Sequence, residues 1–292
     1  MAQDPQALLR QAEKAASGGK GGFSFFGGKT DKLEQAADLY TQAANAFRLQ
    51  KDGESAGQAF EKAAAIQKDQ LKEGGDAANS YVEASKVYRK TSPESCVRVL
   101  SQAIDYYTLS GAFRRAATHK ETLGDIYSID LGDNQHAIEA FETAGQWYED
   151  DNAKSIANKN FLKAADLAAL AEDYYKAIGH YEKVAKDSLS NNTMKWSVKD
   201  YLFKAGICHL ATNDMVGFNR ALQGYAQMDP NFTTQREHKL LVDLGEAIEK
   251  GDKDAFEGSL FQWNQLSPLD SWKTTMFLRI KNAVENAEED FA

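Results

Sequence analysis

The side chains in this sequence that could do chemistry are basic residues that recur at helical spacing. Lys159 and Lys163 are four positions apart, so they share one face of a helix. Several cations together attract an acidic partner far better than one exposed ion pair, which contributes a fraction of a kcal/mol. Solvated helix faces also carry such rows, and the pattern alone leaves both interpretations open. The rows are Arg114, Arg115 and Lys120; Lys154, Lys159 and Lys163; and Lys195, Lys199 and Lys204.

Catalytic and metal-binding patterns are absent from the sequence. The five histidines are widely separated and form no HExxH motif, and no GxSxG turn occurs. Cys96 and Cys208 form neither a CxxC pair nor a Cys/His spacing, which argues against a disulfide framework and a zinc site. We therefore expect no enzymatic activity, no cofactor and no metal.

A glycine-rich stretch from Ser17 to Thr30 contains phenylalanines that an ordinary flexible linker would lack. Its end, Gly28-Lys29-Thr30, resembles the end of the phosphate-binding motif GxxxxGK[ST]. That motif requires glycine at position 23, which is phenylalanine here, and it follows a buried strand rather than a polar helix. The sequence therefore argues against nucleotide binding.

Two interpretations of Phe23, Phe25 and Phe26 remain. They could tuck under the first helical hairpin, or they could dip into a bilayer between the flanking Lys20 and Lys29. Burial of one phenylalanine is worth at most about 1.5–3 kcal/mol, so the loop alone would bind membrane weakly. Such a contact would matter when another partner already holds the chain near the bilayer.

The chain ends in a short acidic segment, in which Glu288, Glu289 and Asp290 precede Phe291. Terminal acidic residues are usually solubilising, but with an exposed aromatic they could dock on a basic surface. The net charge of the 292 residues is −9, which argues against general nucleic-acid binding. Residues 1–14 carry no apolar leader, and no run of about eighteen apolar residues occurs, so we expect a cytoplasmic protein.

The elements that position these residues repeat about every twenty residues. In each repeat a small residue is followed four positions later by a large one, a spacing that suits one face of an α-helix. Short breakers separate the units, so successive helices must fold back as antiparallel hairpins. The pairs are Ala36-Tyr40, Ala56-Phe60, Ala77-Tyr81, Ala137-Phe141, Ala157-Phe161 and Ala177-Tyr181.

We therefore predict an all-α protein, a tetratricopeptide-like right-handed superhelical stack of antiparallel helical hairpins with a C-terminal helical bundle. Residues 1–32 should form an N-terminal helix and the Gly/Phe loop, and residues 33–212 the hairpin stack. Residues 213–292, where the period fails, should form the bundle and acidic tail, with Trp263 and Trp272 in its core.

Several strings, in order along the whole chain, resemble the soluble NSF attachment proteins, the alpha-SNAP family. The resemblance implies a non-enzymatic adaptor of vesicle fusion and intracellular transport. Such an adaptor coats the four-helix SNARE bundle and recruits and stimulates the hexameric ATPase NSF, and its apolar N-terminal loop contacts the cytoplasmic face of membranes. We expect several copies on one SNARE complex and a monomer when free. The strings are LLRQAEK, AADLYTQAANAFRLQKD, GAFRRAA, AIEAFETAGQWYE, ANKNFLKAADLAA, WSVKDYLFKAGICHLA and EEDFA.

The same resemblance implies roles for individual residues. It places Phe23, Phe25 and Phe26 in the membrane loop, and Lys159, Lys163 and Lys199 on the SNARE-binding surface. Thr118 stands where relatives carry a lysine, so Arg114, Arg115 or Lys120 would have to substitute. The NSF-binding residues would be Asp214, Glu246, Glu249, Glu288, Glu289, Asp290 and Phe291, the last replacing the family's leucine.

A second function remains open from the sequence. A tetratricopeptide-like scaffold could bind peptide tails of chaperones or signalling proteins in its groove. Such a groove binds isolated peptides, whereas a SNARE adaptor should require the folded bundle.

Overall fold

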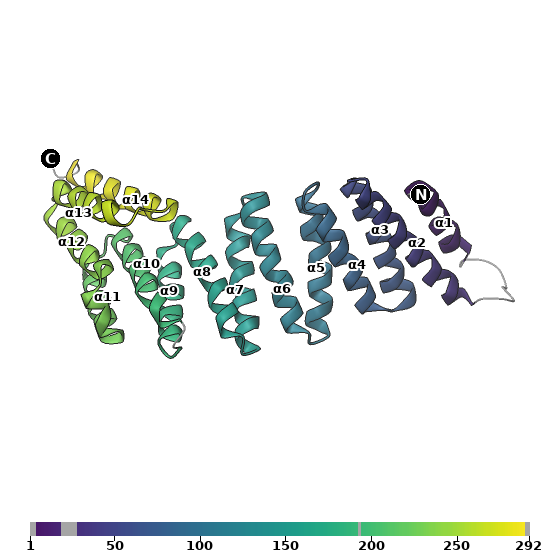
Figure 1. Ribbon diagram of the computed structural model, residues 1–292, viewed down its shortest axis with the longest axis horizontal. Coiled ribbons are helices and arrows are strands. Elements are labelled where there is room, and N and C mark those ends of the chain that lie inside the picture. Colours follow the sequence, from purple (N-terminus) through teal and green to yellow (C-terminus); the bar gives the residue numbers. More distant parts are fainter. Residues whose placement is uncertain (1–3, 19–27, 192–193, 290–292) are drawn as a thin grey trace. The chain divides into compact units, whose positions relative to one another are not determined.

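The computed structural model describes residues 4–18, 28–191 and 194–289, and within these ranges it contains helices and no strands. The all-α class and the antiparallel hairpins are therefore confirmed (Figure 1). Contacts divide the chain into two compact units, Met1–Lys154 and Ser155–Ala292. The sequence-based division at residues 32 and 212 stays a prediction.

The first unit contains seven α-helices among its described residues, most of them joined by turns of a few residues. Two of the helices, α3 and α6, end in a π-helical turn, η1 at Gln67–Leu71 and η2 at Ile126–Leu131. The helices are α1 (Pro5–Gly18), α2 (Lys29–Leu49), α3 (Gly53–Ile66), α4 (Gly74–Tyr88), α5 (Pro93–Leu109), α6 (Phe113–Asp125) and α7 (Asn134–Asp150).

The second unit begins with three further helices of the hairpin series and continues into four that close the chain. The first three are α8 (Lys154–Leu170), α9 (Tyr174–Leu189) and α10 (Val198–Ala211), with a 3-10 turn, η3 (Lys195–Ser197), before α10. The closing helices are α11 (Met215–Met228), α12 (Arg236–Lys250), α13 (Lys253–Leu266) and α14 (Ser271–Glu289), and η4 (Pro230–Thr234) precedes α12.

A repeated turn explains why the chain reverses between helices. A residue one or two positions after the helix adopts a left-handed conformation, with φ of 62° at Lys51 and 66° at Glu172. The aspartate that follows caps the next helix, because its carboxylate accepts a hydrogen bond from a backbone N–H in the first turn. Five turns share this pair, at Lys51-Asp52, Gly132-Asp133, Glu172-Asp173, Asn213-Asp214 and Gly251-Asp252.

Side-chain contacts within each unit join alternate helices, so each hairpin stack has two layers. In the first unit Arg48 of α2 pairs with Glu83 of α4, whereas Arg98 of α5 pairs with Glu61 of α3. In the second unit Tyr225 of α11 donates a hydrogen bond to Glu182 of α9. Even-numbered helices of a stack therefore share one face, and odd-numbered helices share the other.

The small and large residues of the repeat occupy the core between these layers. Phe60, Phe141 and Tyr181 are at most 2% exposed, and the six alanines that precede the large residues are buried as well. Tyr81 is the exception, because it is half-buried. Packing is close enough that a Cβ atom on Gly57 would lie 2.3 Å from the ring of Tyr88. The small positions therefore set how closely neighbouring helices approach.

The closing helices of the second unit pack back on its first helices. Trp272 of α14 is buried and donates a hydrogen bond to the carbonyl oxygen of Asp166 on α8. Arg279 donates to the carbonyl oxygens of Ala169 and Leu170 in the last turn of α8. Trp263 is half-buried with its ring centroid 5.2 Å from that of Phe203. Both tryptophans thus contribute to packing, Trp272 much more completely.

Candidate functional site

The predicted basic residues of α8 and α10 belong to the even-numbered layer of the second unit. Lys159 is exposed and Lys163 is half-buried one turn further along α8. Lys199 of α10 forms an ion pair of 2.8 Å with Glu237 of α12. This contact raises the pKa of Lys199, because the hydrogen bond and the carboxylate both favour the charged amine. Lys159 is therefore the most accessible of these three cations.

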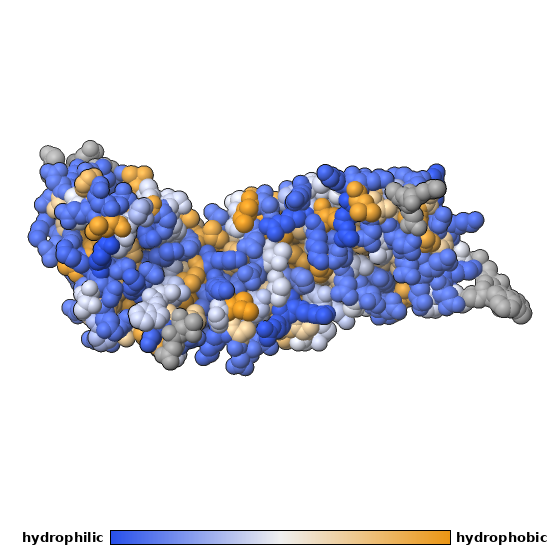
Figure 2. All heavy atoms as spheres, viewed as in Figure 1, coloured by the Kyte–Doolittle hydropathy of each residue, from blue (hydrophilic) through white to orange (hydrophobic). Residues whose placement is uncertain are grey.

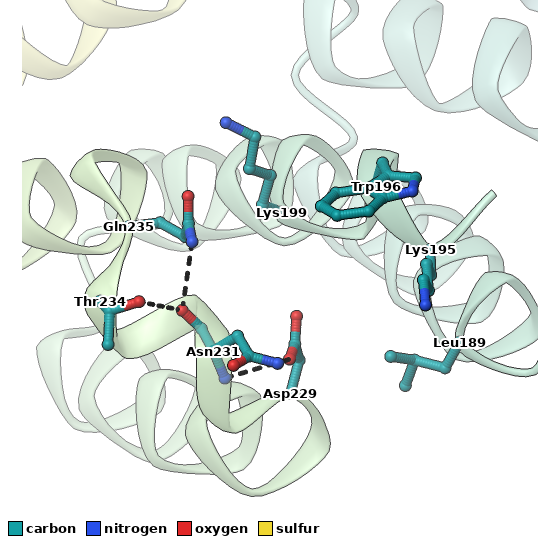
Figure 3. A pocket seen from close by; sticks show the side chains of 8 residues that line it. All are labelled: Leu189, Lys195, Trp196, Lys199, Asp229, Asn231, Thr234 and Gln235. Carbon is teal, nitrogen blue, oxygen red and sulfur yellow. Dashed lines mark hydrogen bonds between the residues drawn. The ribbon is translucent and has the colours of Figure 1, made fainter. Parts of the chain in front are cut away.

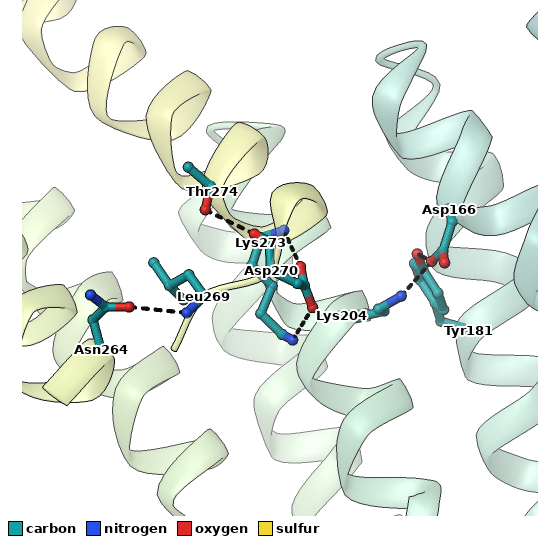
Figure 4. A network of polar contacts seen from close by, with 8 residues as sticks. All are labelled: Asp166, Tyr181, Lys204, Asn264, Leu269, Asp270, Lys273 and Thr274. Atoms are coloured by element: carbon teal, nitrogen blue, oxygen red, sulfur yellow. Dashed lines mark hydrogen bonds and ion pairs between the residues drawn. The ribbon is translucent and has the colours of Figure 1, made fainter. Parts of the chain in front are cut away.

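Lys204 serves packing within the second unit. Its Nζ atom lies 2.6 Å from the Asp166 carboxylate (Figure 4). The same atom lies 4.8 Å from the centroid of the Trp272 ring. The same carboxylate accepts a hydrogen bond from Tyr181. Lys273 and Asp270 form a second ion pair of 2.6 Å at the start of α14. Lys204 thus joins α10 to α8 and α14 rather than presenting its charge to a partner.

A pocket of about 640 Å³ adjoins Lys199 in the second unit (Figure 3). Lys195 and Trp196 of η3 line one side, and Asn231 of η4 lines another. Trp196 is 77% exposed, although a tryptophan usually buries most of its surface. The sequence analysis missed this residue, whose only signal was the string WSVKDY just before a helix.

The predicted basic residues of α6, in the first unit, do not act together. Arg114 pairs with Asp151 at 3.1 Å, and the Arg115 guanidinium lies 5.7 Å from the ring centroid of Tyr107. Lys120 follows Arg114 by six positions and Arg115 by five, so it points about 120–140° away from them on the helix. Thr118 lies one turn after Arg115, and its hydroxyl contacts the Tyr148 hydroxyl at 3.0 Å. Arg114 and Arg115 lie four and three positions before Thr118, so both are on its side of α6. Of the two, Arg115 lines the same cleft as Thr118.

The predicted acidic residues of α11 and α12 are exposed at one end of this helix pair. Asp214 caps α11 by accepting a hydrogen bond of 2.9 Å from Gly217. Glu249 accepts one of 2.8 Å from Asn219, and Glu246 pairs with Lys250 at 3.0 Å. Each carboxylate thus has a structural partner while its outer side faces solvent.

Other predicted site residues lie outside the described part of the chain. These are Phe23, Phe25 and Phe26 of the loop, and Asp290 and Phe291 of the tail. Glu288 and Glu289 belong to the last turn of α14, and the structure describes only their backbone. The flank of the loop is described, where the Gly28 amide donates to the Asp31 carboxylate as α2 begins.

Within the described residues, no three His, Cys, Asp or Glu side chains are grouped so that they could hold a metal ion. Cys96 and Cys208 are both free and buried, and burial raises the pKa of the Cys96 thiol to about 11. A thiol with so high a pKa is a poor nucleophile. None of the described helices combines the length and the apolar character needed to cross a bilayer.

The surface of the described residues is largely polar. Figure 2 shows hydrophilic side chains over most of the visible face, with apolar side chains in small groups between them. Trp196, at 77% exposed, lines the same pocket as Lys195 and Lys199, and Phe113, at 46% exposed, lines a pocket with Arg114 and Arg115. The arrangement offers cations with neighbouring apolar contacts, which suits association with an acidic protein surface.

Comparisons with known proteins identify similar chains over nearly the full length. A family model described as "Soluble NSF attachment protein, SNAP" matches residues 3–285. A probable vesicular-fusion protein sec17 homolog of Neurospora crassa is 49% identical over 292 residues, covering 100% of both chains. Its counterpart in Schizosaccharomyces pombe is 48% identical, covering 99% of each. The human alpha-soluble NSF attachment protein is 38% identical, covering 98% of this chain and 97% of that protein.

Proposed function

Since the chain belongs to the family of soluble NSF attachment proteins, we propose that it is an adaptor that binds assembled SNARE four-helix bundles and recruits and stimulates the NSF ATPase. The full-length family match is the observation that carries this proposal. Accessible Lys159, and Arg115 in the other unit, suit the acidic surface of such a bundle. The adaptor itself would perform no hydrolysis.

The acidic end of the α11–α12 pair is the proposed contact for the ATPase. Asp214, Glu246 and Glu249 are exposed there, and their structural partners leave part of each carboxylate open to solvent. We place the tail residues Glu288 to Phe291 in the same role on the sequence alone. Acidic groups at this end would steer a basic partner domain and set its orientation.

Reconstituted SNARE disassembly tests the adaptor role. Assembled bundles, the ATPase and ATP are mixed with or without this chain, and disassembly is followed by loss of energy transfer between labelled helices. We expect disassembly only when the chain is present, and binding to folded bundles but not to isolated peptide tails. Binding of single peptides with no effect on disassembly would favour the tetratricopeptide-like scaffold instead.

We also propose that Phe23, Phe25 and Phe26 contact membrane. Partial insertion of three phenylalanines is weak by itself but adds to binding of a chain that is already held near the bilayer. Serine at the three positions should therefore slow disassembly of liposome-anchored SNARE bundles much more than that of soluble ones. An equal loss in both formats would assign the three side chains to packing.

A further inference from the structure

The first unit contains a cleft of about 370 Å³ between α4 and α6 that the family match does not explain. Glu83 and Lys86 of α4 line one wall, and Arg115 and His119 of α6 line the other. These residues are three and four positions apart on their helices, so each pair faces the cleft from one side of its helix. Tyr107 of α5, which lies between the two helices along the chain, also lines it.

Cations outnumber anions around this cleft. The Glu83 carboxylate lies 2.5 Å from the Lys86 amine and 3.1 Å from the Arg48 guanidinium, so two cations share one anion. Arg48 lies on α2 outside the cleft, and the charged residues of the lining are the cations Lys86 and Arg115 and the anion Glu83. Arg115 is exposed. A cleft with excess positive charge is able to receive an anion from outside.

Arg115 is held ready for such a contact. Its guanidinium lies 5.7 Å from the ring centroid of Tyr107, and the Tyr107 hydroxyl is fixed by a hydrogen bond of 3.3 Å to Asn79. The buried Tyr107 ring stacks on His119 at a centroid distance of 5.4 Å. An aromatic support restricts the guanidinium and lowers the entropy lost when the planar fork binds a carboxylate.

The protonation of His119 reflects its burial and the positive charges beside it. Burial is the main reason that the pKa of His119 is lowered, and the nearby charges of Lys86 and Arg115 lower this pKa further. His119 is therefore neutral near pH 7, and the charge of the cleft comes from Lys86 and Arg115.

We propose that this cleft binds a carboxylate side chain of the partner helical bundle, with Lys86 and Arg115 as its contacts. The inference rests on the proposed SNARE-binding function and names a contact within it. It assigns the role expected near Thr118 to Arg115 rather than to Arg114 or Lys120, and it adds Lys86, which the sequence analysis did not single out.

The test measures the affinity of the full chain for a soluble, assembled SNARE bundle by fluorescence anisotropy. Arg115→Glu should weaken binding at least tenfold, and the double variant with Lys86→Glu should weaken it further. Arg114→Glu is the matched control, because Arg114 is the adjacent residue on α6 but pairs with Asp151 outside the cleft. It should change the affinity less than threefold.

A local probe separates contact from unfolding. The His119 imidazole NMR signal should shift when the bundle binds the wild-type chain and stay unshifted with Arg115→Glu. Equal losses for Arg114→Glu and Arg115→Glu, or an unmoved His119 signal in the wild-type complex, would overturn the cleft assignment while the adaptor function stands. Failure of the wild-type chain to bind any assembled bundle would overturn both.

Discussion

Replacement of Lys159 and Lys163 by glutamate should lower the affinity for assembled SNARE bundles more than a hundredfold, enough to abolish co-sedimentation. The two side chains lie one turn apart on α8, and that of Lys159 is exposed. Reversal turns two attractions into repulsions, and close charge pairs at interfaces have coupling energies of about 1.5–7 kcal/mol. A hundredfold loss requires only about 2.8 kcal/mol, so the expected effect is within this range.

Two further variants make the result specific. Lys159→Glu alone changes only the exposed cation and should weaken binding about tenfold. Lys186→Glu makes the same charge change at an exposed position of α9, in the other layer of the same unit, and should leave the affinity almost unchanged. Thermal unfolding checks that the double variant still folds. Undiminished binding by a folded double variant would remove α8 from the proposed surface.

The helices were largely predictable because each is encoded locally. A small residue followed four positions later by a large one marks the buried stripe of each helix. Helix-breaking pairs such as Lys51-Asp52 and Glu172-Asp173 mark the turns. The same pattern at Asn213-Asp214 marks Asp214 as a helix cap, whereas the family resemblance implies a partner role for it. The two roles are compatible, because a cap uses one carboxylate oxygen and leaves the other accessible.

The partners of the basic residues were not predictable in the same way. Lys199 and Lys204 look alike in the sequence, five positions apart on one helix, but each reaches a carboxylate 38 positions away. One pairing accompanies a Lys204 amine that lies over the Trp272 ring, and the other leaves Lys199 beside an open pocket. Such differences depend on how three helices pack, which a local pattern does not determine.

The aromatic residues show the same limit. Trp272 was expected in a core and is 8% exposed, whereas Trp196, in a short turn with no helical period, is 77% exposed. Hydrophobic character alone does not distinguish the two residues. Whether a tryptophan ring packs in the core or is exposed to a partner depends on how the neighbouring helices surround it.

Trp272→Ala should lower the free energy of unfolding of the second unit by about 3–5 kcal/mol. The indole is buried against the Tyr181 ring, lies beneath the Lys204 amine, and donates a hydrogen bond to the carbonyl oxygen of Asp166. Truncation would leave a cavity and remove a contact that holds α14 on α8. Urea unfolding followed by circular dichroism measures the loss.

Trp196→Ala is the matched control, since it removes the same side chain from an exposed site of the same unit. It should change the free energy of unfolding by less than about 0.5 kcal/mol. A comparable loss for both variants would mean that Trp272 does not anchor α14. If the anchor is real, Trp272→Ala should also impair stimulation of the ATPase more than binding to the SNARE bundle. This difference is expected because α14 leads into the acidic tail, whereas Lys159 lies on α8, whose helix the substitution does not interrupt.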